Sequence, residues 1–242
     1  SMARAATLDA TTNLDLYPPI PLQSGGQNVA TNGSGVYDFG DKDGNGTRDD
    51  AVTPAGLDFG SNGLYTTNKP SGSISLKLNG GDITNGNNAV TNLSTSIYEW
   101  GGANCGSIVI RDVGQVTLGN VDTHLASDNN NNKSAGAVQI GEPGGTGAGP
   151  AGGVRIANIW TYSGWYGYGG SVAIFSTGNV TMAGSSGTNG NIYTYSGNMA
   201  GGAVNIQHHG AFVAARIQTS ATLIGISSGN PSSGSAAFNG TN

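Results

Sequence analysis

The stretch richest in side chains that could do chemistry is the acidic loop from residue 41 to residue 50, Asp-Lys-Asp-Gly-Asn-Gly-Thr-Arg-Asp-Asp. Oxygen-bearing side chains stand at its positions 1, 3, 5 and 9, and the glycine at position 6 allows the loop to fold back on an ion. Hard cations such as Ca²⁺ take roughly six to eight oxygen ligands. The spacing therefore predicts a structural calcium site. Its expected ligands are Asp41, Asp43, Asn45, Thr47 (through its backbone carbonyl), Asp49 and Asp50.

This loop resembles the calcium loops of EF-hand and thrombospondin-repeat proteins, with one departure. Position 12 is Val52 and not a bidentate glutamate, so Asp49 or Asp50 would have to complete the coordination. Carboxylates held this close repel one another until a cation binds, which would make the ion structural. The alternative is a solvated acidic turn that binds no ion.

A second candidate site is aromatic and lies in the second half of the chain. If Ile159 points inward, the alternation of side chains along a strand puts its neighbour Trp160 outward, and Ile192 does the same for Tyr193. Exposed rings suit the apolar faces of sugars, so we expect a carbohydrate-binding patch. The alternative is a stack of rings that only supports the sheet. The expected binding residues are Trp160, Tyr162, Trp165, Tyr193 and Tyr195.

Signals for catalysis are weaker. A glycosidase needs two carboxyl groups that face each other across a cleft, yet every Asp and Glu precedes residue 143. No nucleophile elbow, phosphate-binding loop or Cys/His metal cluster appears in the sequence. A non-enzymatic role is therefore favoured over a polysaccharide lyase or glycoside hydrolase. The weak catalytic candidates, which would share neighbouring strands, are Arg111, Asp112, Asp122 and His124.

The elements that position these residues follow an internal repeat. Five copies of the pattern Gly-[Ser/Ala]-[Val/Ile]-x-[Ile/Leu] begin at residues 72, 106, 136, 170 and 202, with spacings of 34, 30, 34 and 32 residues. A second pattern, Gly-x-Val-x-[Leu/Ile/Met], follows several of these copies, as at residues 114, 152 and 178. Self-similarity at such a period predicts an architecture in which each unit buries its apolar face against its neighbours.

Within one repeat the inward-facing residues change parity. Even-numbered residues up to Leu118 and odd-numbered ones from Val121 alternate inward, so the chain must bend at Gly119-Asn120. Asn158 and Asn191 take the same corner place, which suits a residue that tolerates the left-handed conformation. These features predict an all-β fold, a right-handed parallel β-helix with three short strands per coil of 30–34 residues.

The repeat divides the chain into three parts. Residues 1–71 are expected to form an irregular N-terminal cap and first coils that carry the calcium loop, and residues 72–226 the regular coils. Residues 227–242, rich in Ser and Gly, are expected to form a flexible C-terminal tail.

The glycine-led strand patterns of residues 72–224 resemble the β-solenoid repeats of bacterial surface proteins of the filamentous-haemagglutinin and autotransporter-passenger type. The resemblance implies an extracellular or cell-surface module with a structural or adhesive role, part of a longer repeat protein, with a glycan or another cell-surface ligand as partner. It assigns no catalytic residue to this chain.

The composition favours an exported protein. It predicts no nucleic-acid partner and no membrane-spanning segment. The net charge is −5, and nine scattered Lys and Arg form no basic stripe for a nucleic-acid backbone. No apolar run reaches the length of about 18 residues that a membrane-spanning helix needs. The single cysteine, Cys105, cannot form an intrachain disulfide and is expected to be a small buried side chain.

Overall fold

The computed structural model describes residues 57–59, 63–66, 71–78, 80–85, 89–98, 103–126, 133–143, 149–183 and 190–219, and the backbone of further strands at 3–4, 8–10, 22–24, 27–29, 37–38, 79 and 236–240. Throughout these residues the secondary structure is all-β and includes no helix, which confirms the expected all-β class. In this part of the chain, consequently, there is no helix long and apolar enough to cross a membrane.

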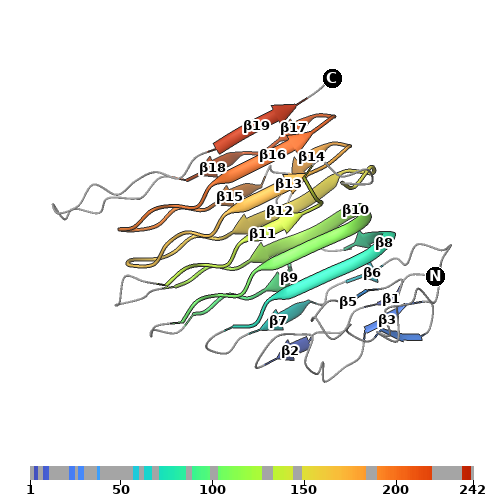
Figure 1. Cartoon of the computed structure of the whole chain (residues 1–242), viewed down its shortest axis with the longest axis horizontal. Helices are drawn as coiled ribbons and strands as arrows, with labels where there is room; N and C mark the ends of the chain where they lie inside the picture. The colour runs from blue at the N-terminus through green and yellow to red at the C-terminus, as the bar shows by residue number, and fades with distance from the viewer. Residues whose placement is uncertain are drawn as a thin grey trace.

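Nearly all of the placed strands join one sheet, and they pair in parallel (Figure 1). The exception is an antiparallel pair, β3 with β4. The strands are β1 (Ala3–Arg4), β2 (Leu8–Ala10), β3 (Leu22–Ser24), β4 (Gln27–Val29), β5 (Tyr37–Asp38), β6 (Leu57–Asp58), β7 (Leu64–Thr66), β8 (Ile74–Thr84), β9 (Thr91–Ser94), β10 (Ile108–Asp122), β11 (Val138–Ile140), β12 (Val154–Trp160), β13 (Val172–Phe175), β14 (Val180–Met182), β15 (Asn191–Tyr193), β16 (Val204–His208), β17 (Phe212–Val213), β18 (Arg216–Gln218) and β19 (Ala236–Gly240).

Strand pairing follows the repeat that the sequence displays. Leu76 is in register with Ile110, Ile110 with Ile140, Ile140 with Ile174, and Ile174 with Ile206. These partners are 34, 30, 34 and 32 residues apart, the same spacings as the repeated glycines. Each repeat therefore lies beside the next, as the stacked ribbons of Figure 1 show.

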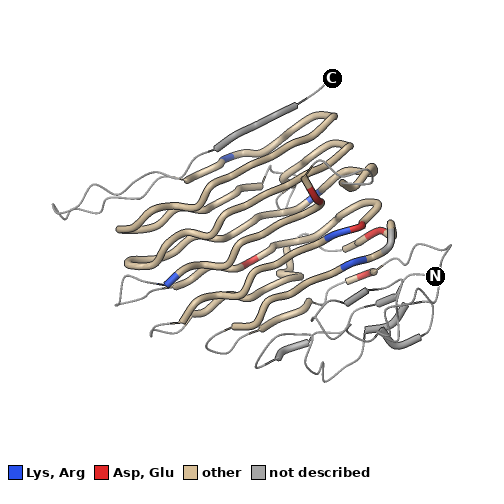
Figure 2. Tube along the Cα trace, in the orientation of Figure 1, with Lys and Arg blue, Asp and Glu red and all other residues tan. Residues whose placement is uncertain are grey.

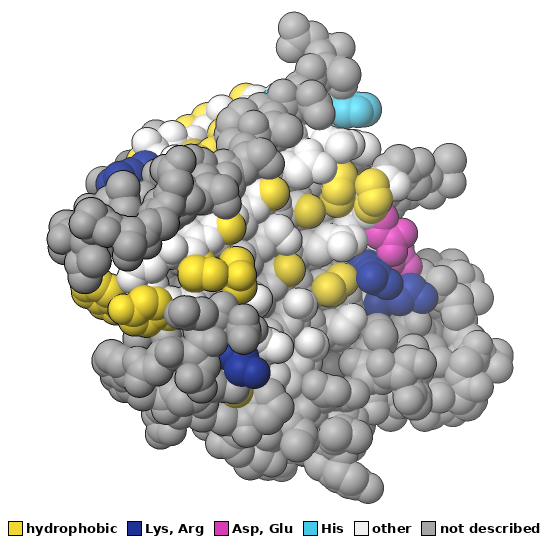
Figure 3. Space-filling view, turned by 60° about the vertical axis from the view of Figure 1, so that its left-hand side comes forward, with side chains coloured by type: hydrophobic (Ala, Val, Ile, Leu, Met, Phe, Trp, Pro, Cys, Tyr) yellow, Lys and Arg dark blue, Asp and Glu magenta, His cyan; other side chains and the backbone are white. Residues whose placement is uncertain are grey.

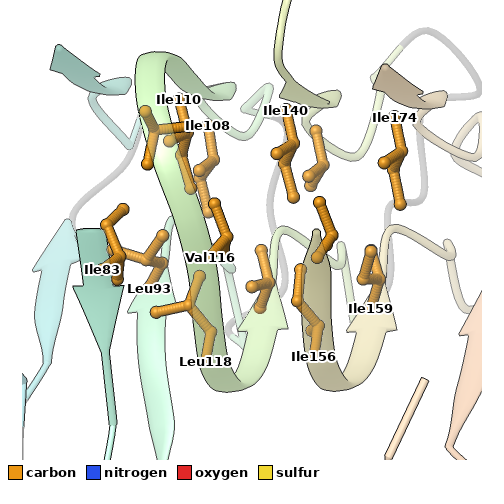
Figure 4. Packing of buried hydrophobic residues seen from close by; sticks show 14 of the residues in the cluster. Ile83, Leu93, Ile108, Ile110, Val116, Leu118, Ile140, Ile156, Ile159 and Ile174 are labelled. Atoms are coloured by element: carbon orange, nitrogen blue, oxygen red, sulfur yellow. The ribbon is translucent and has the colours of Figure 1, made fainter. Parts of the chain in front are cut away.

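The core is built from the inward-facing aliphatic residues of successive repeats. Ile108, Ile110, Val116 and Val121 have no exposed surface, and Leu118 is 1% exposed, so the predicted inward parity is confirmed. Figure 4 shows the side chains of these strands directed towards one another, with Ile140 and Ile174 in the same row as Ile108 and Ile110. Burying one such side chain contributes about 2 kcal/mol, and the column repeats it in every unit.

The number of strands differs between repeats. The repeats that begin at residues 170 and 202 each have three short strands, but β10 runs unbroken from Ile108 to Asp122. Its pairing with β8 shifts register between Arg111 and Val116, where Asp112 adopts a φ of 47°. The first bend of this repeat is thus absorbed inside one continuous strand.

The corner asparagines form a ladder of side-chain amides. Nδ2 of Asn158 donates to Oδ1 of Asn120 at 2.9 Å, and the backbone N–H of Asn191 donates to Oδ1 of Asn158 at 3.0 Å. The expected left-handed backbone is not the reason for asparagine here, because Asp112 is the one non-glycine residue with positive φ among the described residues. Asparagine is used because its side chain both donates and accepts between neighbouring strands.

The repeated glycine lies where successive repeats approach each other closely and where a threonine hydroxyl binds its carbonyl. In each repeat a buried Thr hydroxyl donates to the carbonyl of the glycine that opens the next first strand. A Cβ on Gly136 or Gly170 would collide with the carbonyl oxygen of the preceding glycine, so only glycine allows this approach. The five bonds are Thr66 to Gly72 (2.7 Å), Thr95 to Gly106 (2.5 Å), Thr123 to Gly136 (2.5 Å), Thr161 to Gly170 (2.6 Å) and Thr194 to Gly202 (2.7 Å).

Parallel pairing extends into both terminal segments. Strands β5 and β6 pair with successive parts of β8, and β7 pairs with β9. Strand β19 pairs in parallel with β16 within residues 227–242, where the sequence predicts a tail.

Candidate aromatic binding face

The candidate site lies on the outer side of five neighbouring strands that pair in the order β9, β10, β12, β15 and β18. Asp122 is in register with Ser94 on one side and Trp160 on the other, Trp160 with Tyr193, and Tyr193 with Gln218. The residues that directly precede Asp122, Trp160 and Tyr193 face the core and have no exposed surface: Val121, Ile159 and Ile192. Because side chains alternate along a strand, the residues of this row point away from the core. The predicted pairing of Trp160 with Tyr193 on adjacent strands is confirmed.

Two residues beyond Asp122, Trp160 and Tyr193, the rings of His124, Tyr162 and Tyr195 form a stack, and Tyr98 meets the His124 end of it. We call these four rings the aromatic ladder. The His124 and Tyr162 rings are stacked, with centroids 4.8 Å apart and planes at 11°. Tyr162 stacks on Tyr195 at 5.0 Å and 9°, and Tyr98 meets His124 edge-on at 4.6 Å. Each such pair contributes about 1 kcal/mol beyond the area it buries.

The rings of the face are partly open to solvent. Trp160, Tyr162, Tyr193 and Tyr195 are half-buried, and Tyr193 meets Tyr195 edge-on at 6.1 Å. The following loop adds more exposed rings, namely Trp165 (41% exposed), Tyr166 (37%) and Tyr168 (37%). On the face of the molecule drawn in Figure 3, apolar side chains lie among uncharged polar atoms, and charged groups are confined to a few places.

Asp122 and His124 form a closely bonded pair at one end of the ladder. Nδ1 of His124 lies 2.6 Å from Oδ1 of Asp122, and the same oxygen accepts the backbone N–H of His124 at 3.0 Å. The hydroxyl of Tyr98 donates to Oδ2 of Asp122 at 3.0 Å. Because Asp122 is only 1% exposed, these donors replace the water that its carboxylate would otherwise bind.

The pKa values of the ladder's tyrosines are raised to different extents and by different neighbours. Burial, and then the nearby Tyr195 and Asp122, raise the pKa of Tyr162 to about 12. The pKa of Tyr98 is raised by desolvation and then by the charge of Asp122; its ring is largely exposed, but its hydroxyl end lies against the protein. At the other end, desolvation raises the pKa of Tyr195 while the positive charge of Arg216 lowers it.

The four catalytic candidates do not form one group. Asp122 and His124 are together, whereas Nε of Arg111 lies 3.5 Å from a carboxylate oxygen of Glu142 in an exposed ion pair. Asp112 occupies the register shift of β10. The exposed ion pair of Arg111 with Glu142 contributes little to the free energy of unfolding, about 0–1 kcal/mol.

The expected calcium ligands Asp41, Asp43, Asn45, Thr47, Asp49 and Asp50 lie outside the described residues. Within the described part of the chain, no three residues among His, Cys, Asp and Glu lie close enough to hold a metal ion. Cys105 is buried, as expected, and desolvation raises the pKa of its thiol to about 12.

Of the ladder, sequence reasoning missed Tyr98 and named His124 only as a catalytic candidate. His124 is two residues beyond Asp122 and so occupies the row of Tyr162 and Tyr195, a signal that parity along the strand contains. Tyr98 follows the isolated bridge of Ile97 with Leu125, and no repeat pattern marks it. Its place in the stack depends on the tertiary structure.

Comparisons with known proteins leave the family of the chain open. It matches no family model, no curated protein and no solved structure. The resemblance to bacterial surface repeats therefore stays a prediction, and the geometry of the aromatic face is the basis for a functional proposal.

Proposed function

We propose that this protein is a non-enzymatic, surface-displayed or secreted module that binds carbohydrate through its aromatic face. In this proposal the parallel strands wind as a right-handed β-helix, and the chain belongs to a longer bacterial surface protein of adhesive function. The winding makes binding possible, because stacked repeats hold aromatic rings from separate parts of the sequence in one rigid row.

One observation supports the proposal most directly. The adjacent strands β12 and β15 present Trp160 beside Tyr193 and Tyr162 against Tyr195, and the loop after β12 adds exposed Trp165. Contiguous half-exposed aromatic rings are uncommon on protein surfaces that bind nothing. They are typical of sites that bind a flat, partly apolar ligand. Sugar rings have such apolar faces and hydroxyl edges that the neighbouring polar side chains can bind.

The test is a glycan array with the wild-type chain and the double variant Trp160→Ala, Tyr193→Ala. Binding should be abolished, while the thermal midpoint stays within about 3 °C because both rings are half-exposed. A matched control, Phe212→Ala, removes a partly buried ring from a different strand, β17. If the double variant still binds glycans like the wild type, the face is not the site.

A second candidate function is a polysaccharide lyase or glycoside hydrolase, and the Asp122–His124 pair is the observation that favours it. A carboxylate that holds one ring nitrogen of a histidine orients the other nitrogen for proton transfer. The discriminating measurement is the release of reducing ends or unsaturated products from acidic polysaccharides. Turnover that His124→Gln abolishes would support the enzyme, and absence of turnover supports the binding module.

A further inference from the structure

The charge around the aromatic face is unevenly distributed. No Asp or Glu occurs after Glu142, whereas the strands that bear Trp160, Tyr162, Tyr193 and Tyr195 all follow that residue. The two arginines of this part of the chain are Arg155 and Arg216. Figure 2 shows the consequence, since the tube from β13 to β18 is almost free of charged residues apart from a basic segment at β18.

Arg216 lies on the same outer side as the aromatic rings. It is the first residue of β18 and is exposed, while its neighbour Ile217 packs against the hydrophobic core. Side chains alternate along a strand, so Arg216 points outward. In register it stands beside Asn191, one strand and two residues from Tyr193, a diagonal of about 8 Å between Cα atoms given ordinary strand spacing and rise.

No carboxylate of the described residues forms an ion pair with Arg216, in contrast to Arg111, which is paired with Glu142. The charge of Arg216 also reaches the ladder, because it lowers the pKa of Tyr195 against the larger effect of desolvation. A guanidinium presents a planar fork of donors that matches a carboxylate or sulfate. Beside the half-exposed rings, the guanidinium of Arg216 could therefore bind the anionic group of a ligand.

The opposite end of the ladder has the opposite sign. Asp122 is held there beneath His124 and Tyr98, and its charge raises the pKa of both Tyr98 and Tyr162. A ligand with an acidic group would therefore be repelled at the Tyr98 end and attracted at the Tyr195 end.

From these positions we propose that the ligand of the aromatic face is an acidic glycan, whose carboxylate is bound by Arg216 while its sugar rings stack on Trp160, Tyr193 and Tyr195. This proposal rests on the proposed carbohydrate-binding function and narrows it to uronate-containing chains. It also fixes a direction, with the acidic group over β18 and the neutral remainder extending towards β10.

The test uses two hexasaccharides that differ in one carboxylate: five neutral sugars with one terminal galacturonate, and the same hexamer with that carboxylate methyl-esterified. Titration calorimetry with the wild-type chain should show about tenfold tighter binding of the acid, the expected worth of one charge-assisted contact. Arg216→Gln should remove this preference and leave binding of the ester unchanged. Arg155→Gln is the matched control: it removes the same charge from the exposed side of β12, in register with Thr117 and Thr181 and away from the rings, and should keep the preference.

The outcomes separate the two proposals. Equal affinity of the wild-type chain for acid and ester, a preference that survives in Arg216→Gln, or an equal loss in Arg155→Gln would overturn the anionic subsite and leave carbohydrate binding intact. A chain that binds neither hexamer and no glycan of a broad array overturns both. Added salt should weaken the preference for the acid and not the binding of the ester.

Discussion

The imidazole of His124 stacks on the phenol ring of Tyr162 with their planes at 11°, while its Nδ1 lies 2.6 Å from the carboxylate of Asp122. One buried side chain thus joins the aromatic ladder to a buried charge. This double role makes His124 the residue on which the structure of the face depends most.

Replacement of His124 by alanine should destabilise the protein by about 3 kcal/mol, because it leaves the buried carboxylate of Asp122 without its strongest partner. Urea denaturation followed by fluorescence would measure the loss. His209→Ala, at an exposed histidine, is the control and should change the free energy of unfolding by less than about 0.5 kcal/mol. Similar losses in the two variants would contradict the role of the pair.

The glycine columns predict a sharp difference between two Gly→Ala changes. In Gly170→Ala the new methyl group collides with the backbone carbonyl of Gly136, which cannot move without its strand, so we expect a loss of about 3 kcal/mol or failure to fold. In Gly152→Ala the nearest atom to the new methyl group is Cβ of Gln115, at 2.9 Å, so a smaller shift relieves the contact and we expect a smaller loss. Thermal denaturation of both variants checks this; equal midpoints would show that the strands are not so closely spaced.

The threonine hydroxyls should contribute separately from threonine's shape. Thr161→Val keeps the volume but leaves the carbonyl of Gly170 without its donor at 2.6 Å, so we expect a loss of about 1–2 kcal/mol. Thr161→Ser keeps the hydroxyl and should retain that bond, at the smaller cost of a missing methyl group. If valine proves as stable as threonine in chemical denaturation, the hydrogen bond has no net effect on stability.

Alkaline pH should weaken the fold through Tyr162. Because burial raises its pKa from 10.0 to about 12 in the folded chain, the native state holds this proton more tightly than the unfolded state does. The resulting stabilisation is complete below pH 10 and is lost as the pH rises through about 12. Tyr162→Phe should therefore show a shallower decline of stability between these values than the wild type. A decline of equal steepness in both chains would contradict the assignment.

Calcium binding by residues 41–50 stays a prediction of the sequence, and chelation tests it. Removal of Ca²⁺ should lower the melting temperature by about 5 °C, as loss of a ligand that contributes about 2 kcal/mol would. The double variant Asp43→Asn, Asp49→Asn should melt at the same temperature with and without Ca²⁺. A wild-type melt that chelation leaves unchanged excludes a stabilising ion.

Much of the strand arrangement could be predicted from local pattern. The glycine spacings gave the register of the sheet, since the same residue types recur wherever a strand meets its counterpart, as with Ile140 and Ile174. Parity placed Trp160 and Tyr193 side by side. The strand count was less predictable, because whether a bend interrupts β10 depends on the backbone of Asp112 and not on the apolar pattern.

The sequence by itself determined which residues face inward and which outer positions are neighbours, because alternation along a strand and a fixed repeat leave little freedom once the apolar residues are buried. Only the tertiary structure decided which contacts and hydrogen bonds the neighbouring outer side chains form. Examples are the edge-on contact of Tyr98 with His124, the burial of the Asp122–His124 pair and the bonds from each threonine to the next repeat's glycine. Their geometry depends on the path of the corners, which no local pattern specifies.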